Sequence, residues 1–263
     1  MSTLRKLVLT DNMWRVETLP FPQPPADSVD AVVEATLLTP EAQGHGLWVG
    51  HDALSPTTRY AGWGPAMDRL SINRRDLVTL PEGSSDPLAA GLLMPACAIA
   101  SALEGLTITP HAAVVGEGLL ADLATGILAL RGFALEAAQP GADLDLVVDT
   151  GGGPGLEASG LSALRGEGTL LLLVPPWSKP VNVSFYPYIH RRSLVVIARR
   201  WHCQPQAVGQ ELVDSLRPVV SRVVGESRWL RPLAIGSAAV QRGVWQWMDW
   251  QGVPCTLTPQ SPS

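Results

Sequence analysis

The sequence contains few cysteines and no cluster of basic residues. Its three cysteines, Cys97, Cys203 and Cys255, are too few and too scattered for a disulfide framework. The 19 Lys and Arg residues are outnumbered by 24 Asp and Glu, which gives a net charge of −5. Because no block of Lys or Arg is present, the chain offers no basic surface, and we expect no nucleic-acid partner.

Long apolar runs are also lacking. Runs such as Leu170–Val174 are too short to span a bilayer. The first residues, MSTLRKLVLTDNMWR, lack the apolar stretch of a secretory signal. We therefore expect a protein without a membrane span, located in a bacterial-type cytoplasm.

Clusters of metal ligands are a third absence. The first hundred residues hold one cysteine, Cys97, and two histidines, His45 and His51, without the spacing of a ligand set. The adjacent His202 and Cys203 are poor candidates, because neighbouring residues on a strand point to opposite faces and no third ligand is near. The sequence thus predicts no metal site and no zinc.

Hydrophobic residues make up 46% of the 263 residues, enough for a folded chain with a sizeable core. In the first part, apolar alternation predicts short strands, whereas residues 39–65 show no period and predict a loop. A helix is expected over 86–106, with Asp86 as its cap and Pro87 at its first position. Pro95 is a possible kink or restart of that helix. The predicted strands are 4–10, 13–18, 30–38, 67–72 and 76–80.

The chain is organised around residues 111–132, HAAVVGEGLLADLATGILALRG. Ala112–Val115 is an apolar run typical of a buried parallel strand. It leads into a turn containing Gly116 and Gly118, after which apolar residues recur at helical spacing. This order matches the first half of a dinucleotide-binding unit, in which glycines let the backbone approach a pyrophosphate at a helix N-terminus. Ala121 replaces the third glycine, where a small side chain suffices. A tight strand-to-helix turn that binds no nucleotide would show the same pattern.

Strands and helices alternate in the rest of the chain, which predicts a parallel sheet with helices on both faces. Thr150 follows one of these strands and is a further candidate for cofactor binding. The predicted strands are 133–137, 145–149, 168–174, 181–186 and 194–198, and the predicted helices are 156–164, 206–224 and 237–248.

The order of these pieces resembles the medium-chain dehydrogenase/reductase superfamily. The segments that carry the resemblance are DAVVEATLL, DRLSINRRDLVTLPEGSSDPLAAGL, the glycine turn, DLDLVVDTGG and LSALRGEGTLLLLV. The segment VNVSFYPYIHRRSLVVIARRW looks most like the bacteriochlorophyllide dehydrogenase branch.

The resemblance implies an α/β fold with two domains. One is a shortened, β-rich, GroES-like domain over residues 1–85, to which residues 226–263 return. The other is a reduced Rossmann-like domain over residues 86–225. The resemblance also implies NAD or NADP as cofactor, and a homodimer paired through an edge strand within residues 181–198.

One part of the nucleotide-binding unit is missing from the sequence. A complete βαβ unit needs about 30 residues or more, yet only residues 138–144 separate the predicted strands 133–137 and 145–149. The half of the sheet that normally holds the adenosine ribose is therefore expected to be deleted. Glu136 is a candidate for the acidic residue that binds ribose hydroxyls, although a surface charge fits it equally well. We expect NAD or NADP to bind weakly or not at all.

Cys97 is a candidate nucleophile. It lies just after Pro95, where a restarted helix would place the thiol at a helix N-terminus and lower its pKa. A small cysteine buried among alanines is the alternative interpretation.

A second chemical candidate is the segment SFYPYIHRR. Tyr186 or Tyr188 could donate a proton and His190 could act as acid or base, with Arg191 and Arg192 as ligands of an anion. A partly exposed loop with stacked aromatic rings explains the same residues.

The tail VWQWMDWQGVP carries Trp245, Trp247 and Trp250. These rings predict an aromatic wall for a large hydrophobic substrate or a subunit interface, or a helix that caps the core.

Two functions remain open at this point. The first is a zinc-free NAD(P)-dependent oxidoreductase that acts on a hydrophobic small molecule, in secondary metabolism or another biosynthesis. The second is a cofactor-independent cyclase, lyase, isomerase or acyl-transfer enzyme on a relic dehydrogenase scaffold, or a binding protein without catalysis. Fold resemblance favours the first, and the missing adenosine half favours the second.

Overall fold

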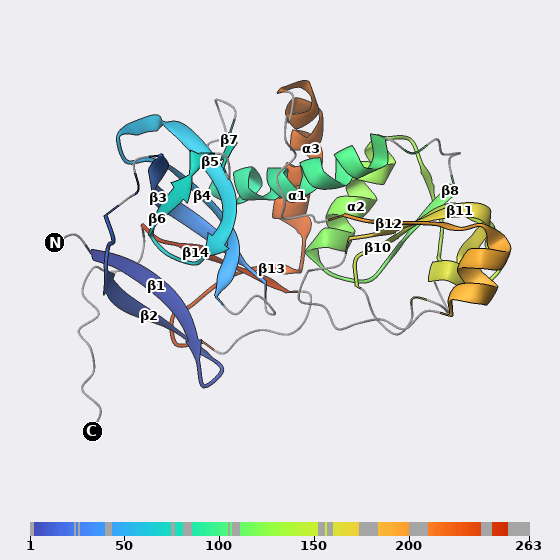
Figure 1. Cartoon of the computed structure of the whole chain (residues 1–263), viewed down its shortest axis with the longest axis horizontal. Coiled ribbons are helices and arrows are strands. Elements are labelled where there is room, and N and C mark those ends of the chain that lie inside the picture. The colour runs from blue at the N-terminus through green and yellow to red at the C-terminus, as the bar shows by residue number, and fades with distance from the viewer. Residues whose placement is uncertain are drawn as a thin grey trace. The chain divides into compact units, whose positions relative to one another are not determined.

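The structure is a computed structural model that describes residues 3–23, 25, 27–39, 44–74, 77–80, 86–104, 106, 111–151, 156, 160–173, 184–199, 210–237 and 244–251. The chain forms two compact units (Figure 1). The first unit comprises Met1–Gly91 and Leu230–Ser263, and the second comprises Leu92–Trp229.

The first unit begins with a hairpin. Strands β1 (Thr3–Thr10) and β2 (Met13–Pro20) pair in antiparallel register along their whole length. Asp11 and Asn12 connect them with φ angles of 52° and 61°, as a two-residue turn of a right-twisted hairpin requires. The two strands expected at the start of the chain are therefore confirmed.

A seven-stranded sheet forms the rest of the first unit. Its order is β13-β14-β3-β4-β5-β7, and β6 pairs with β3. The strands are β3 (Ser28–Leu38), β4 (His45–Asp52), β5 (Ser55–Pro65), β6 (Arg69–Asn73), β7 (Val78–Thr79), β13 (Leu230–Pro232) and β14 (Trp245–Asp249). Its core contains the fully buried side chains of Trp14, Trp48 and Trp250.

The prediction of a loop over residues 39–65 is wrong, because β4 and β5 lie there. Glycine in these strands reflects close packing and not turns. A Cβ at Gly46 would lie 2.2 Å from the carbonyl oxygen of Leu37, and one at Gly62 would lie 2.7 Å from the Trp48 ring. These glycines interrupt the apolar alternation on which the prediction depended.

The predicted helix 237–248 is also wrong where the structure describes it, because residues 245–249 form β14. Trp245 and Trp250 are buried, and the Trp250 indole N–H donates to Thr36 Oγ1 at 2.9 Å. The tryptophans of the tail thus belong largely to the core of the first unit, and residues 238–243 lie outside the described residues.

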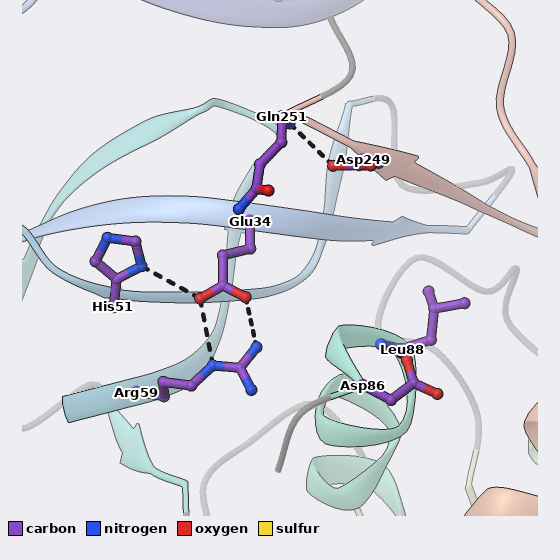
Figure 2. Close-up of polar contacts among 7 residues, drawn as sticks. All are labelled: Glu34, His51, Arg59, Asp86, Leu88, Asp249 and Gln251. Carbon is purple, nitrogen blue, oxygen red and sulfur yellow. Dashed lines mark hydrogen bonds and ion pairs between the residues drawn. The ribbon is translucent and has the colours of Figure 1, made fainter. Parts of the chain in front are cut away.

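Helix α1 (Pro87–Glu104) runs through Pro95 without a restart. Asp86 caps it, since Asp86 Oδ1 accepts a hydrogen bond from the Leu88 backbone N–H at 2.9 Å (Figure 2). By length and composition α1 could cross a bilayer, but 67% of it is buried inside the protein. Burial to this extent is typical of a core helix.

The second unit is built on a five-stranded parallel sheet of order β12-β11-β10-β8-β9. The strands are β8 (His111–Val115), β9 (Ala134–Leu135), β10 (Leu144–Asp149), β11 (Leu164–Leu172) and β12 (Val195–Ala198), and the long helices are α2 (Leu119–Leu130) and α3 (Gln210–Glu226). Helix α3 packs closely on α2, because a Cβ at Gly126 would lie 2.6 Å from Val219 Cγ1. The chain is thus an α/β protein in which a β-rich part accompanies a reduced, Rossmann-like parallel sheet.

Two predicted elements of this unit differ from the structure. In the predicted helix 156–164, the described residues are helical but not α-helical. Leu156 and Gly160 are π-helical, Leu161–Ala163 forms the 3-10 turn η4, and β11 starts at Leu164. In the predicted strand 181–186, residues 181–183 lie outside the described residues and Phe185–His190 forms the π-helix η5. The aromatic residues favoured a strand, but Pro187 cannot donate to a strand ladder.

Candidate functional site

The candidate site is the turn between β8 and α2. Gly116 and Gly118 have φ angles of 110° and 113°, which residues other than glycine rarely adopt. A Cβ at Gly116 would lie 2.5 Å from Thr150 Oγ1 and 2.9 Å from the Gly151 backbone nitrogen. The turn therefore requires glycine both for its conformation and for its close approach to the end of β10.

Helix α2 starts directly at this turn. The carbonyl oxygen of Gly118 accepts hydrogen bonds from the backbone N–H groups of Ala121 and Asp122 at 3.0 and 3.1 Å, and no side chain caps the helix. The first N–H groups of a helix have no partner within the helix, and together with the dipole they favour an anion. Ala121 is buried, which agrees with the need for a small side chain at its position.

The turn lies at a topological switch point. Strand β8 is flanked by β9 on one side and by β10 on the other, so the chain leaves β8 toward one edge and later returns on the other side. In open α/β sheets, ligands bind at such a point, beyond the carboxyl ends of the strands. The location therefore fits a ligand site independently of any sequence motif.

The residues after β10 hold the other side of the turn. Asp149 is 1% exposed, and its Oδ1 accepts a hydrogen bond from the Gly151 backbone N–H at 2.8 Å. Asp149 was not among the residues predicted from sequence. The sequence nevertheless contains a signal for its role, because an aspartate two residues before a glycine at the end of a strand is typical of an Asx turn.

On its other side, β8 has a very short neighbour. Strand β9 has two residues, and residues 136–143 form neither helix nor strand before β10 begins. The predicted absence of a helix and a strand between these two strands is confirmed. The Glu136 carboxylate contacts His111 Nδ1, at the amino end of β8, whereas the glycine turn follows its carboxyl end.

The segment of Tyr186 and His190 lies at the amino ends of the strands, whereas the glycine turn lies at the carboxyl ends. Tyr188, on the same π-helix η5, packs against a cluster that extends along β10 and β11, and η5 directly precedes β12 in the chain. Figure 1 draws η5 in orange at the right. The following Arg192 donates from Nη1 to the carbonyl of Leu161, which lies just before β11, at 3.0 Å. The length of the strands thus separates η5 from the glycine turn.

Within η5 the exposed side chains stack on one another. The rings of Tyr186 and His190 lie 4.9 Å apart between centroids, and the Arg191 guanidinium lies 5.6 Å from the centre of the Tyr186 ring. Tyr186 is 60% exposed. This arrangement agrees with the alternative of stacked aromatic rings at the surface.

Cys97 lies within α1 and is 2% exposed. Burial raises the pKa of its thiol to about 12, so the thiol is protonated at neutral pH. A nucleophilic cysteine needs the thiolate. The geometry therefore favours a packing role for Cys97.

His51, one of the two histidines of the first unit, belongs to an ion network. His51 Nδ1 lies 3.2 Å from Glu34 Oε1, and Arg59 binds the same carboxylate through Nε and Nη2 (Figure 2). Arginine already balances this carboxylate, as in a structural ion network. No three His, Cys, Asp or Glu residues in the described part of the chain are grouped as metal ligands, and His202, Cys203 and Cys255 lie outside it.

No protein-family model and no curated protein matches this sequence. Solved structures, in contrast, match nearly its whole length. Galactitol-1-phosphate dehydrogenase from Escherichia coli superposes with a TM-score of 0.69 at 14% identity, covering 93% of this chain and 99% of that one. S. aureus TarJ in complex with NADPH gives 0.68 at 13% identity, with 95% and 99% covered. A cinnamyl alcohol dehydrogenase from Sorghum bicolor gives 0.65 at 13% identity, with 98% and 100% covered.

This likeness shows the fold. The chain has the dehydrogenase fold in which a GroES-like part accompanies a Rossmann-like part, in agreement with the resemblance to the medium-chain superfamily. The bacteriochlorophyllide dehydrogenase branch stays a prediction.

Proposed function

We propose that the protein is a zinc-free, nicotinamide-dependent oxidoreductase that acts on a carbonyl, alcohol or enone group of a hydrophobic small molecule. The observation that carries this proposal is the glycine turn at the switch point of a dehydrogenase fold. Solved structures with this fold include complexes with NADPH and NADH.

The turn fits the phosphate part of such a cofactor. At Gly116 the backbone approaches Thr150 too closely for a side chain, and Gly118 opens α2 without a capping side chain. Backbone N–H groups at the start of α2 would therefore face the phosphate oxygens. The bound nicotinamide would supply or accept the hydride.

The proposal assigns no role in hydride transfer to Tyr186 and His190. They belong to η5, which precedes β12 in the chain and is followed by Arg192, whose guanidinium binds the Leu161 carbonyl just before β11. Both observations place η5 at the amino ends of these strands, whereas ligands of open α/β sheets bind at the carboxyl ends. Cys97 likewise has no chemical role in this proposal, because its thiol is buried and protonated.

The test is a calorimetric titration of the protein with NADH and NADPH. Gly118→Asp places a negative charge where the phosphate would lie and should raise the dissociation constant at least about tenfold, which is about 1.4 kcal/mol. Gly141→Asp is the matched control. Gly141 also has a positive φ, and nothing lies within 4 Å of an added Cβ there, so this variant adds the same charge at a positive-φ position away from the turn.

A wild-type protein that binds neither cofactor at millimolar concentration would overturn the proposal. Stoichiometric zinc retained through dialysis, measured by elemental analysis, would overturn its zinc-free part.

A second candidate is a cofactor-independent enzyme, or a binding protein, on the same scaffold. The observation that favours it is the two-residue β9, beside which the described residues form no further strand of an adenosine half. Turnover of a substrate by a protein that binds no nicotinamide nucleotide would support this candidate.

A further inference from the structure

We infer that the site recognises a phosphate and the mononucleotide beside β10–β12, and makes no use of an adenosine. A nicotinamide mononucleotide should then bind about as tightly as the complete dinucleotide. This inference rests on the proposed function and names the ligand class of the same site.

The first support is the difference in length between β8 and β9. Strand β9 pairs with His111 and Ala112 alone, and the Glu136 backbone N–H adds one hydrogen bond to the Ala112 carbonyl. In the part of the chain that the structure describes, no strand pairs with Ala113–Val115 on this side, over about 10 Å at 3.3 Å per residue. Among the described residues, no strand therefore lines the glycine turn on the side where adenosine binds in complete folds.

The second support is the direction of the Glu136 side chain. In complete dinucleotide-binding folds, an acidic residue about 20 positions after the glycine motif accepts hydrogen bonds from the adenosine ribose. Glu136 has this spacing, but its carboxylate is engaged by His111. His111 and Val115 are the two ends of β8, about 13 Å apart, so this carboxylate points away from the turn.

The third support is the composition of the segment that replaces the missing elements. Residues 137–143 read AAQPGAD and return the chain to β10 through Gly141 and Asp143, both with positive φ. None of these residues is aromatic or a large aliphatic that could cover an adenine. Leu135 is 38% exposed, which agrees with the position of β9 at the end of the described sheet.

The opposite half of the sheet keeps its three strands in the described part of the chain. Strands β10, β11 and β12 pair in parallel along their length, and Thr150 contacts the turn from the end of β10. Each half of a doubly wound sheet binds one mononucleotide. One half with its phosphate cradle is present here, and the other is reduced to β8 and a two-residue strand.

The experiment compares reduced nicotinamide mononucleotide, NADH and NADPH by calorimetry on the full chain. We expect dissociation constants within about threefold of one another, and we expect ADP-ribose to compete at least tenfold more weakly than the mononucleotide. Gly118→Asp should weaken the mononucleotide and NADH by the same factor, because both depend on one phosphate cradle.

The Glu136→Gln variant tests separately whether this carboxylate binds the adenosine ribose. If Glu136 does not reach a ribose, the variant should change neither dissociation constant by more than about twofold. A loss of NADH affinity without a loss of mononucleotide affinity would overturn the inference, because it would assign the ribose to Glu136.

The two proposals fail in different ways. NADH binding at least thirtyfold tighter than the mononucleotide contradicts the inference and leaves the proposed function standing. Failure of all three nucleotides to bind contradicts the proposed function itself.

Discussion

Thr150 donates two hydrogen bonds to the carbonyl oxygen of Val115, from its backbone N–H at 2.9 Å and from Oγ1 at 3.2 Å. Val115 ends β8 and Thr150 follows β10, so this contact joins two strand ends at the point where the glycine turn begins. The geometry of the turn therefore depends on a residue 34 positions after Gly116.

Replacement of Thr150 tests this dependence. Thr150→Val keeps the shape of the side chain but removes the hydroxyl, and it should lower the free energy of unfolding by about 1 kcal/mol. It should also weaken NADH binding severalfold, because the end of β10 is held less firmly. Thr150→Ser keeps the hydroxyl and serves as the control in urea unfolding and calorimetry. Equal stability and affinity in Thr150→Val and the wild type would contradict the prediction.

Replacement of Glu117 should strengthen NADH binding, in contrast to the replacement of Thr150. It is exposed and lies between the two glycines of the turn, where its negative charge opposes a bound phosphate. Glu117→Gln should tighten NADH binding about two- to threefold, and the gain should shrink as salt screens the charge. Glu167→Gln, an exposed change in β11, is the matched control. Unchanged or weaker binding by Glu117→Gln would argue against a phosphate at the turn.

The sequence predicted this turn well because its physical requirements are local. Gly116, Gly118 and Ala121 are defined by backbone conformation and by close approach, which the residue types report directly. The short connection after β9 could also be counted from the sequence. The packing partners were harder to predict. Thr150 was recognised only as a neighbour of a strand end, and Asp149 was missed.

The failures share one cause, which is tertiary context. Gly46 and Gly62 indicated a loop because the strand and the Trp48 ring that they accommodate are distant in sequence. The aromatic residues of η5 indicated a strand and a chemical role, yet their segment forms a π-helix that precedes β12, at the amino end of that strand. Neither outcome follows from local propensity, because tertiary packing overrides it.

The raised pKa of Cys97 leads to a third prediction. With a pKa of about 12 caused by burial, Cys97 should resist a thiol reagent at pH 7 in a chain whose Cys203 and Cys255 are replaced by alanine. The same chain unfolded in guanidinium should react quickly and serves as the control. Rapid labelling of the folded chain at pH 7 would instead support a nucleophile.

The same shift has a consequence for stability. Because the folded pKa is raised above the unfolded value, the contribution of Cys97 is fully present below about pH 8.5, the usual thiol pKa. It is lost as the pH rises toward 12. In the Cys97→Ala variant, the free energy of unfolding should therefore decrease less between about pH 8.5 and pH 12 than in the wild type. Urea unfolding across this pH range measures the difference.

The last prediction concerns assembly through β12. Val195 and Val196 are 47% and 40% exposed, and neighbouring residues on a strand point to opposite faces. Both faces of this strand are therefore exposed at an edge of the parallel sheet, which favours pairing with another strand. We expect a homodimer in which β12 pairs with its copy across a two-fold axis.

Light scattering should give the dimer mass at micromolar concentration, and Val196→Lys should raise the dimer dissociation constant at least tenfold. Leu54→Lys, at a 92% exposed leucine of the first unit, should leave assembly unchanged. A monomeric wild-type protein, or equal effects of the two lysine variants, would exclude this interface.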